Sequence, residues 1–289
     1  MKEIVKEKIA SLLSGDEEIQ SVEQLGGMTN QNYLVQTSSN QYIVKFFGKG
    51  TDKLIDRQNE KFNLELLKDL KLDVENYLFD IEAGIKVNQY IENAETLDSA
   101  TIKTKFEKIA PILQTIHASG KELKGEFAPF EEIKKYETLI QGEISYPNYE
   151  VVRKSVFSLK DQLEQIGIDQ KSCHIDLVPE NFIEAPDGHL YLIDWEYSSM
   201  NDPMWDLAAL FLESEFTPEE EEDFLAHYES EKTPVSREKI RIYKILQDII
   251  WSLWTIYKEE NGADFGDYGI SRYNRAVKEL ESEGDLNEN

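Results

Sequence analysis

Two short stretches of the sequence combine the residue types that phosphoryl transfer requires. The first, Cys173–Asn181, contains the pattern H-x-D-x-x-x-x-N, and Asp194 follows 13 residues after Asn181. The Asp176 carboxylate can accept a proton from an attacking hydroxyl, while Asn181 and Asp194 offer oxygen ligands to a magnesium ion that bridges nucleotide phosphates. Mg²⁺ prefers such hard ligands. The spacing therefore predicts a catalytic aspartate beside a magnesium site.

A glycine-containing turn is the candidate contact for nucleotide phosphates. It lies between predicted strands over residues 19–25 and 32–36, and it contains Gly26, Gly27, Thr29 and Asn30. Glycines let backbone amides approach a phosphate closely, and small polar side chains add donors. Most such turns are plain hairpins, but a lysine on the next strand, Lys45, favours ATP binding here.

Lys45 is placed among apolar residues in the stretch Tyr42–Phe47, which favours a paired role over a solvated one. Glu60, near the start of the following predicted helix, is its natural partner, and Glu65, one turn deeper, is the competing candidate. Such an ion pair would hold the lysine against the α- and β-phosphates. Lys45 is therefore assigned to catalysis and ATP binding, with Glu60 in support.

A group of aromatic residues late in the chain could hold an organic cation. Trp251 and Trp254 are three residues apart and share one face of a predicted helix, and Tyr268 follows. Aromatic faces attract quaternary ammonium groups by about 0.5–2 kcal/mol each. Glu196 and Glu213 are the carboxylates expected to balance that cation.

Residues around the catalytic stretch are expected to have structural roles. Asp206 is expected to tie down the catalytic loop, His174 to form hydrogen bonds within it, and Cys173 to be a small buried neighbour. The remaining histidines show no supporting constellation and are left out of the chemistry: His117, His189 and His227.

The net charge of −26 argues against nucleic acids and anionic membranes as partners, because both are polyanions. Residues 93–289 hold 20 basic and 41 acidic residues, a balance of −21, which would attract a cationic small molecule. Most of these charges are expected to solvate helix faces. One cysteine excludes an intramolecular disulfide, and the charged N-terminus and lack of long apolar runs favour a cytoplasmic protein without membrane insertion.

Apolar periodicity predicts an α+β fold with two lobes. Residues 1–91 should form a nucleotide-binding lobe with a small antiparallel sheet, a short helix at 4–13 and a helix at 56–70 inserted after the third strand. Residues 92–289 should form a mostly helical catalytic lobe, with the lobes joined through Asn88–Asn93. The other predicted strands are 42–47, 77–80, 85–91 and a hairpin over 182–194; the other helices are 101–118, 130–141, 148–166, 203–213, 217–228 and 236–258.

The motifs Gly26–Asn30, Cys173–Asn181, Leu192–Ser198 and Asn201–Ala208 resemble those of the choline/ethanolamine kinase family, within the aminoglycoside-phosphotransferase-like kinases. The similarity spans nearly the whole chain and is strongest to bacterial Lic-type members. It implies a two-lobed protein-kinase-like fold, ATP and Mg²⁺ as cosubstrate and cofactor, and phosphocholine as product. No protein partner is implied.

The resemblance also implies roles for individual residues. Gln89 and Ile91 fall on the hinge whose backbone meets adenine, and Val178 stands where some members place a glutamine near the nucleotide. The remaining matched positions agree with the roles given above: Lys45, Asp176, Asn181, Asp194, Glu213, Trp251, Trp254 and Tyr268.

Two alternatives remain open at the level of sequence. One is a kinase of the same fold that phosphorylates ethanolamine, another amino alcohol, an aminoglycoside or a sugar. The other is a non-catalytic choline-binding sensor, although such a protein should have lost a metal ligand or the base, and this chain retains Asp176, Asn181 and Asp194.

Overall fold

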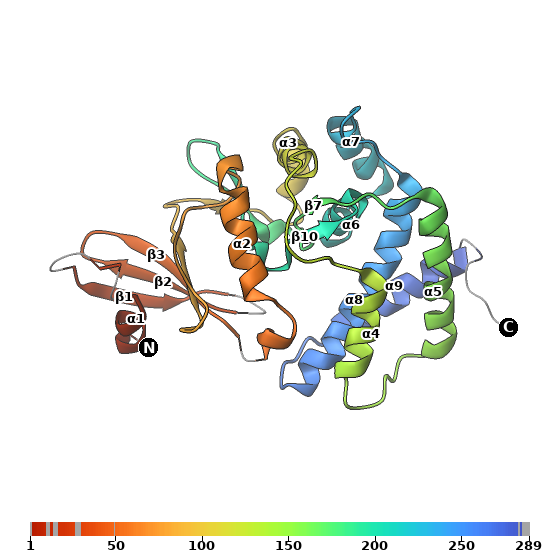
Figure 1. The fold of residues 1–289 in the computed structure, drawn as a ribbon, viewed down its shortest axis with the longest axis horizontal. Coiled ribbons are helices and arrows are strands. Elements are labelled where there is room, and N and C mark those ends of the chain that lie inside the picture. The colour runs from red at the N-terminus through yellow and green to blue at the C-terminus, as the bar shows by residue number, and fades with distance from the viewer. Residues whose placement is uncertain are drawn as a thin grey trace.

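A computed structural model describes residues 2–9, 12–13, 17–26, 30–48, 50–282 and 284. Figure 1 shows a β-sheet built by the first ninety residues at one side and a group of helices at the other. The predicted α+β fold, with an antiparallel N-terminal sheet and a mostly helical C-terminal part, is confirmed.

The N-terminal sheet has five antiparallel strands in the order β1-β2-β3-β5-β4. They are β1 (Ile19–Gln24), β2 (Gln31–Thr37), β3 (Gln41–Phe46), β4 (Asn76–Asp80) and β5 (Ile85–Gln89). Alternation along the strands gives the sheet one apolar face, where Val44 pairs with Val87 in a small core beside α1 (Lys2–Ile9). The opposite face therefore receives Lys45 and Lys86, which are direct neighbours across β3 and β5.

Helix α2 (Arg57–Leu67) connects β3 to the second half of the sheet. Asp56 caps it by accepting hydrogen bonds from the backbone N–H groups of Gln58 and Asn59. Asn63 reaches from the same helix to the backbone carbonyls of Lys124 and Ser198, so α2 contacts both lobes.

The helical lobe has one continuous apolar core. Its helices are α3 (Phe106–His117), α4 (Pro129–Leu139), α5 (Tyr149–Ile166), α6 (Pro203–Glu213), α7 (Pro218–Tyr228), α8 (Arg237–Glu260) and α9 (Tyr268–Ser282). Two small sheets carry the catalytic segments: β7 (Lys171–Cys173) with β10 (Ser199–Asn201), and β6 (Glu95–Thr96) with β8 (Phe182–Glu184) and β9 (Leu190–Leu192).

Most predicted elements are confirmed with small shifts at their ends, although residues 10 and 11 of the helix predicted at 4–13 lie outside the described residues. The short strands β6, β7 and β10 were not predicted. The helix predicted from residue 101 begins at Phe106, after a 3-10 turn at Ile102–Thr104. Helix α9 was not predicted, although Tyr273, Val277 and Leu280 recur at helical spacing and pack in the core.

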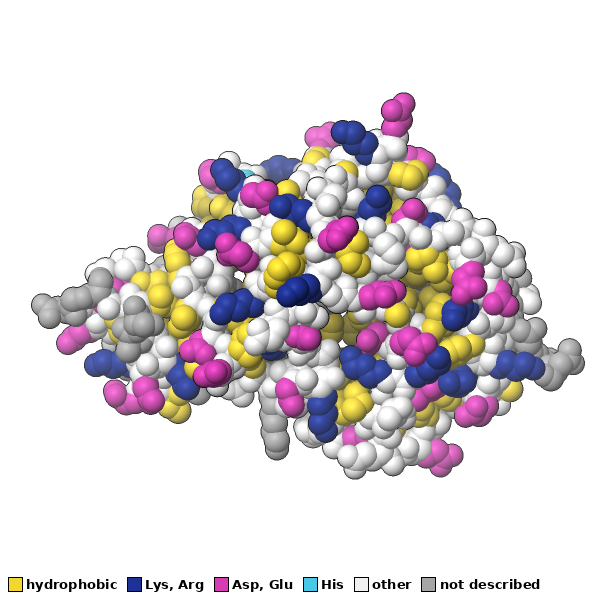
Figure 2. All heavy atoms as spheres, viewed as in Figure 1, with side chains coloured by type: hydrophobic (Ala, Val, Ile, Leu, Met, Phe, Trp, Pro, Cys, Tyr) yellow, Lys and Arg dark blue, Asp and Glu magenta, His cyan; other side chains and the backbone are white. Residues whose placement is uncertain are grey.

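Acidic and basic side chains are interspersed on the face shown in Figure 2, as expected if most charges solvate the surface. Among the described residues, none of the helices is both long and apolar enough to cross a membrane.

Candidate active site

A cleft of about 800 Å³ lies between the sheet and the helical lobe. It gathers most of the residues that the sequence singled out: Gly26, Asn30, Lys45, Gln89, Ile91, Asp176, Asn181, Asp194, Glu196, Glu213, Trp251, Trp254 and Tyr268. Glu60 does not line it. Gly27 and Thr29 lie outside the described residues.

Asp176, the candidate catalytic residue, follows a strained residue. Ile175 has a φ of 79°, a left-handed conformation that is rare for a β-branched side chain. Its backbone is held on both sides, because its N–H donates to Asp206 Oδ1 at 2.8 Å and its carbonyl accepts from Trp205 Nε1 at 3.0 Å. This sharp turn carries Asp176 from the end of β7 into the cleft, and such strain is typical of functional sites.

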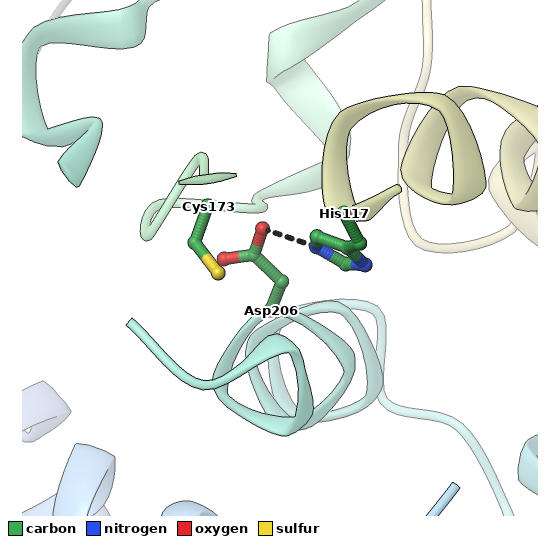
Figure 3. Close-up of side chains that lie close together, drawn as sticks. All are labelled: His117, Cys173 and Asp206. Carbon is green, nitrogen blue, oxygen red and sulfur yellow. Dashed lines mark hydrogen bonds and ion pairs between the residues drawn. The ribbon is translucent and has the colours of Figure 1, made fainter. Parts of the chain in front are cut away.

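Asp206 is the anchor of that loop, as the sequence predicted. Figure 3 shows it between His117 and Cys173, which come from other elements. Its Oδ2 accepts from the His174 N–H at 2.8 Å and lies 3.0 Å from His117 Nε2. Burial raises the pKa of Cys173 well above its usual range, so the side chain stays a thiol. The three residues therefore form a structural anchor whose carboxylate is already saturated by donors, and a metal ion is not required.

His174 also behaves as predicted. Its Nε2 donates to the carbonyl of Ile193 at 3.0 Å, which joins the catalytic loop to the strand before Asp194. Burial lowers its pKa, so the ring stays neutral at physiological pH.

Asp194 faces the cleft with a φ of 68° at the start of a short 3-10 turn, Trp195–Tyr197. Lys45 Nζ donates to its Oδ1 at 2.6 Å. Burial alone would raise the pKa of Asp194, but Lys45 and Lys86 outweigh it and lower the pKa to about 2. Asp194 is therefore a carboxylate at every physiological pH.

Asn181 and Asp194 fit a magnesium site by the chemistry of their donors. Asn181 Nδ2 donates to the backbone carbonyl of Asp176 at 2.9 Å, which turns its amide nitrogen inward and leaves its carbonyl oxygen for the cleft. One amide oxygen and one carboxylate are hard ligands, and they leave positions for water and phosphate.

The predicted pairing of Lys45 with Glu60, or with Glu65, is wrong. Glu60 Oε1 accepts from Lys86 Nζ at 2.6 Å, and its Oε2 accepts from Arg57 Nη1 at 2.6 Å. The cause is the sheet register: Lys45 and Lys86 are opposite each other on one face, so each needs its own carboxylate. Lys86 pairs with Glu60, the carboxylate from α2, and Lys45 pairs with Asp194.

Glu196 is also hydrogen-bonded to other side chains of the protein. Its Oε2 accepts from Asn30 Nδ2 at 2.7 Å and from Arg57 Nη1 at 2.9 Å. Arg57 also donates to Asn30 Oδ1 at 3.0 Å. That Glu196 balances a bound cation stays a prediction: Glu196 lines the cleft, but it also pairs with Arg57, and Asn30 forms part of this network.

The aromatic residues predicted for an organic cation line one end of the cleft. The rings of Trp251 and Trp254 are 6.4 Å apart and nearly perpendicular, at 89°. Tyr197, which the sequence analysis missed, adds a third ring 6.0 Å from Trp251 at 76°. Tyr268 is 37 % exposed and completes the wall. Tyr197 could have been identified from the sequence, because it directly follows Glu196 and lies close to Asp194 along the chain.

The other end of the cleft suits a flat heterocycle. Apolar side chains line it from both lobes: Ile43, Val74, Ile183 and Ile193. Gln89 and Ile91, which the family resemblance assigns to the adenine hinge, line the cleft, and Val178 lines it as well.

Asp176 carries an unusually high pKa. Burial and, to a smaller extent, repulsion from the neighbouring carboxylates Asp194, Glu213 and Glu196 together raise the pKa of Asp176 to about 8. An acid with this pKa can exchange a proton near neutral pH, as a general base must.

Comparison with known proteins shows which family the chain is similar to. A family model described as choline/ethanolamine kinase matches residues 22–277. Protein LicA of Haemophilus influenzae is 31% identical over 269 residues, which cover 89% of this chain and 79% of that protein. Ethanolamine kinase 2 of Rattus norvegicus is 27% identical over 87% of this chain and 74% of its own length.

Solved structures extend the comparison. Choline kinase LicA from Streptococcus pneumoniae superposes with a TM-score of 0.94 and 76% identity, covering 98% of this chain and 99% of that chain. LicA in complex with AMP gives a TM-score of 0.92 at 77% identity, covering 97% and 98%. A spectinomycin phosphotransferase shares the fold, with a TM-score of 0.64 and 16% identity over 98% of each chain.

Replacing Glu60 should destabilise the protein, because Glu60→Gln leaves Lys86 buried without its carboxylate and leaves Arg57 with Glu196 as its remaining one. We expect the free energy of unfolding to fall by about 3–5 kcal/mol. Glu65→Gln, on an exposed position of the same helix, is the matched control and should change it by less than about 0.5 kcal/mol. Urea denaturation measures both, and equal effects would contradict the observed pairing.

The high pKa of Asp176 predicts a pH-dependent loss of stability. In the unfolded chain the carboxyl ionises near pH 4, whereas in the fold it resists ionisation up to about pH 8, so stability falls as pH rises between these values. Asp176→Asn cannot ionise. The melting temperature of Asp176→Asn minus that of wild type should therefore increase by at least about 2–4 °C from pH 5 to pH 9.

These melting curves are recorded in EDTA without nucleotide, with Asp161→Asn as the control, because Asp161 is exposed on α5. A difference between Asp176→Asn and wild type that stays constant with pH would show that Asp176 is not held protonated.

Proposed function

The chain belongs to the choline/ethanolamine kinase family, and from this we propose that it transfers the γ-phosphoryl group of ATP to the hydroxyl of choline, giving phosphocholine and ADP. One observation supports the proposal beyond the family: Asp176, the Lys45–Asp194 pair and the aromatic wall of Trp251 and Trp254 all line one cleft. The phosphate donor and a cationic acceptor can thus meet at one carboxylate.

At the nucleotide end, adenine would occupy the apolar slot beside Gln89 and Ile91. Lys45 lies on a rigid central strand and is oriented by Asp194 at 2.6 Å, so its ammonium can bind phosphate oxygens without large motion. Asn181 and Asp194 would hold Mg²⁺. When bound, the ion neutralises charge on the nucleotide phosphates.

At the acceptor end, the indole and phenol rings would hold the trimethylammonium group by cation–π attraction. The choline hydroxyl then points toward Asp176, which orients it and accepts its proton as the oxygen attacks phosphorus. A bound cation lowers the pKa of Asp176 from about 8, because opposite charge favours the carboxylate. Choline binding therefore helps to generate the ionised base, and the remaining acceleration comes from positioning.

Removing the base should abolish phosphoryl transfer. We expect Asp176→Ala to lower kcat with choline by about 10²–10⁴-fold, the usual contribution of general base catalysis. ADP release measured with wild-type protein and a panel of choline, ethanolamine and aminoglycosides identifies the acceptor. Turnover of Asp176→Ala near the wild-type rate, in folded protein, would refute the mechanism, and ADP release that no acceptor stimulates would refute the function.

The aromatic wall can be tested separately. Trp251→Ala should raise the KM for choline about tenfold, corresponding to a loss of about 1–2 kcal/mol of cation–π attraction, while the KM for ATP stays unchanged. Phe62→Ala removes an exposed aromatic ring from α2 and serves as the control. An unchanged choline KM in Trp251→Ala would mean that Trp251 only packs in the core.

A further inference from the structure

A buried arginine contacts two residues that line the end of the cleft where choline would bind. Arg272 lies on α9 and is 4% exposed. Its Nη1 donates to Glu213 Oε1 at 2.5 Å and to the Tyr268 hydroxyl at 2.7 Å. Both partners line the cleft, whereas Arg272 itself does not. The sequence analysis did not single out this residue.

Arg272 is held in place from the other side by a carboxylate. Asp248, buried on α8, lies 3.0 Å from Arg272 Nε and also accepts two hydrogen bonds from Arg275 at 2.6 Å. The two arginines thus balance Glu213 and Asp248. Among the described residues, Arg272 Nη2 has no hydrogen-bond partner. Because a buried N–H group of a charged side chain without an acceptor is unfavourable, stability alone does not explain an arginine at this position.

Arg272 donates hydrogen bonds to oxygens that could otherwise accept hydrogen bonds from an alcohol substrate at this end of the cleft. One oxygen of Glu213 and the oxygen of Tyr268 already receive its donors, and Glu196 Oε2 receives Asn30 and Arg57. A primary ammonium needs acceptors for three N–H groups, whereas a quaternary ammonium has none to satisfy. An unmade hydrogen bond to a charged group is a large penalty in a desolvated site.

We propose that Arg272 is a specificity-determining residue: by engaging Glu213 and Tyr268 it biases the pocket toward quaternary ammonium alcohols and against primary ones. The proposal rests on the proposed choline kinase function. Arg272 acts through Glu213 and Tyr268 and is a positioning residue. Without it, the Glu213 carboxylate becomes free to accept hydrogen bonds from a primary ammonium.

The test compares kcat/KM for choline and ethanolamine in wild type and in Arg272→Gln, with ATP saturating. The ratio of choline to ethanolamine should fall about tenfold or more, mainly through a lower KM for ethanolamine, with kcat retained. Arg275→Gln is the matched control, because Arg275 pairs with Asp248 and, within the described part of the chain, forms no hydrogen bond or ion pair with Glu213 or Tyr268, so its ratio should equal that of wild type.

Arg272→Lys provides a second measurement and decides the matter if Arg272→Gln does not fold. A lysine ammonium can pair with Glu213 but lacks the planar fork that also reaches Tyr268 and Asp248, so its ratio should lie between those of wild type and Arg272→Gln. An unchanged ratio, or an equal loss of activity toward both alcohols, would overturn the specificity role. A wild-type protein that phosphorylates neither alcohol would instead overturn the proposed function.

Discussion

Two lysines placed side by side across the central strands impose the arrangement of the whole cleft. Lys45 and Lys86 are direct neighbours in the β3–β5 register, and both point away from the apolar core of the sheet. Their mutual repulsion on a desolvated face requires two carboxylates. One comes from α2, as Glu60, and the other from the helical lobe, as Asp194. Pairing the two lysines of the sheet with carboxylates therefore holds both α2 and the helical lobe against the sheet.

The same charge balance continues to the acceptor end. Arg57 shares its guanidinium between Glu60 and Glu196, and Arg272 engages Glu213, so the carboxylates predicted to attract a cation already have internal partners. Under the proposed function, the aromatic rings are then the groups left to recognise a trimethylammonium. The strongly acidic composition provides a field around the protein, whereas discrimination among cations depends on which acceptors stay free.

Strain in the catalytic loop is held by buried polar contacts. Ile175 keeps its unusual backbone conformation because Asp206 and Trp205 bind its N–H and carbonyl. His117 in turn contacts Asp206, which links α3 to the loop. These groups lie behind Asp176 and touch no reacting atom, yet they orient it.

From the sequence alone, most of the elements and the candidate catalytic group could be predicted. Strand and helix periodicities are local, and Asp176, Asn181 and Asp194 lie within 19 residues, so a short loop and hairpin bring them together. Tertiary structure alone decided the ion-pair partners, because these join segments far apart: Lys45 to Asp194, Glu60 to Lys86 and Glu213 to Arg272. Any of several carboxylates could have met a given lysine. Strand register and helix packing decide which carboxylate pairs with each lysine, because they set the positions of the charges in three dimensions. The spacing of residues in the sequence does not encode these positions.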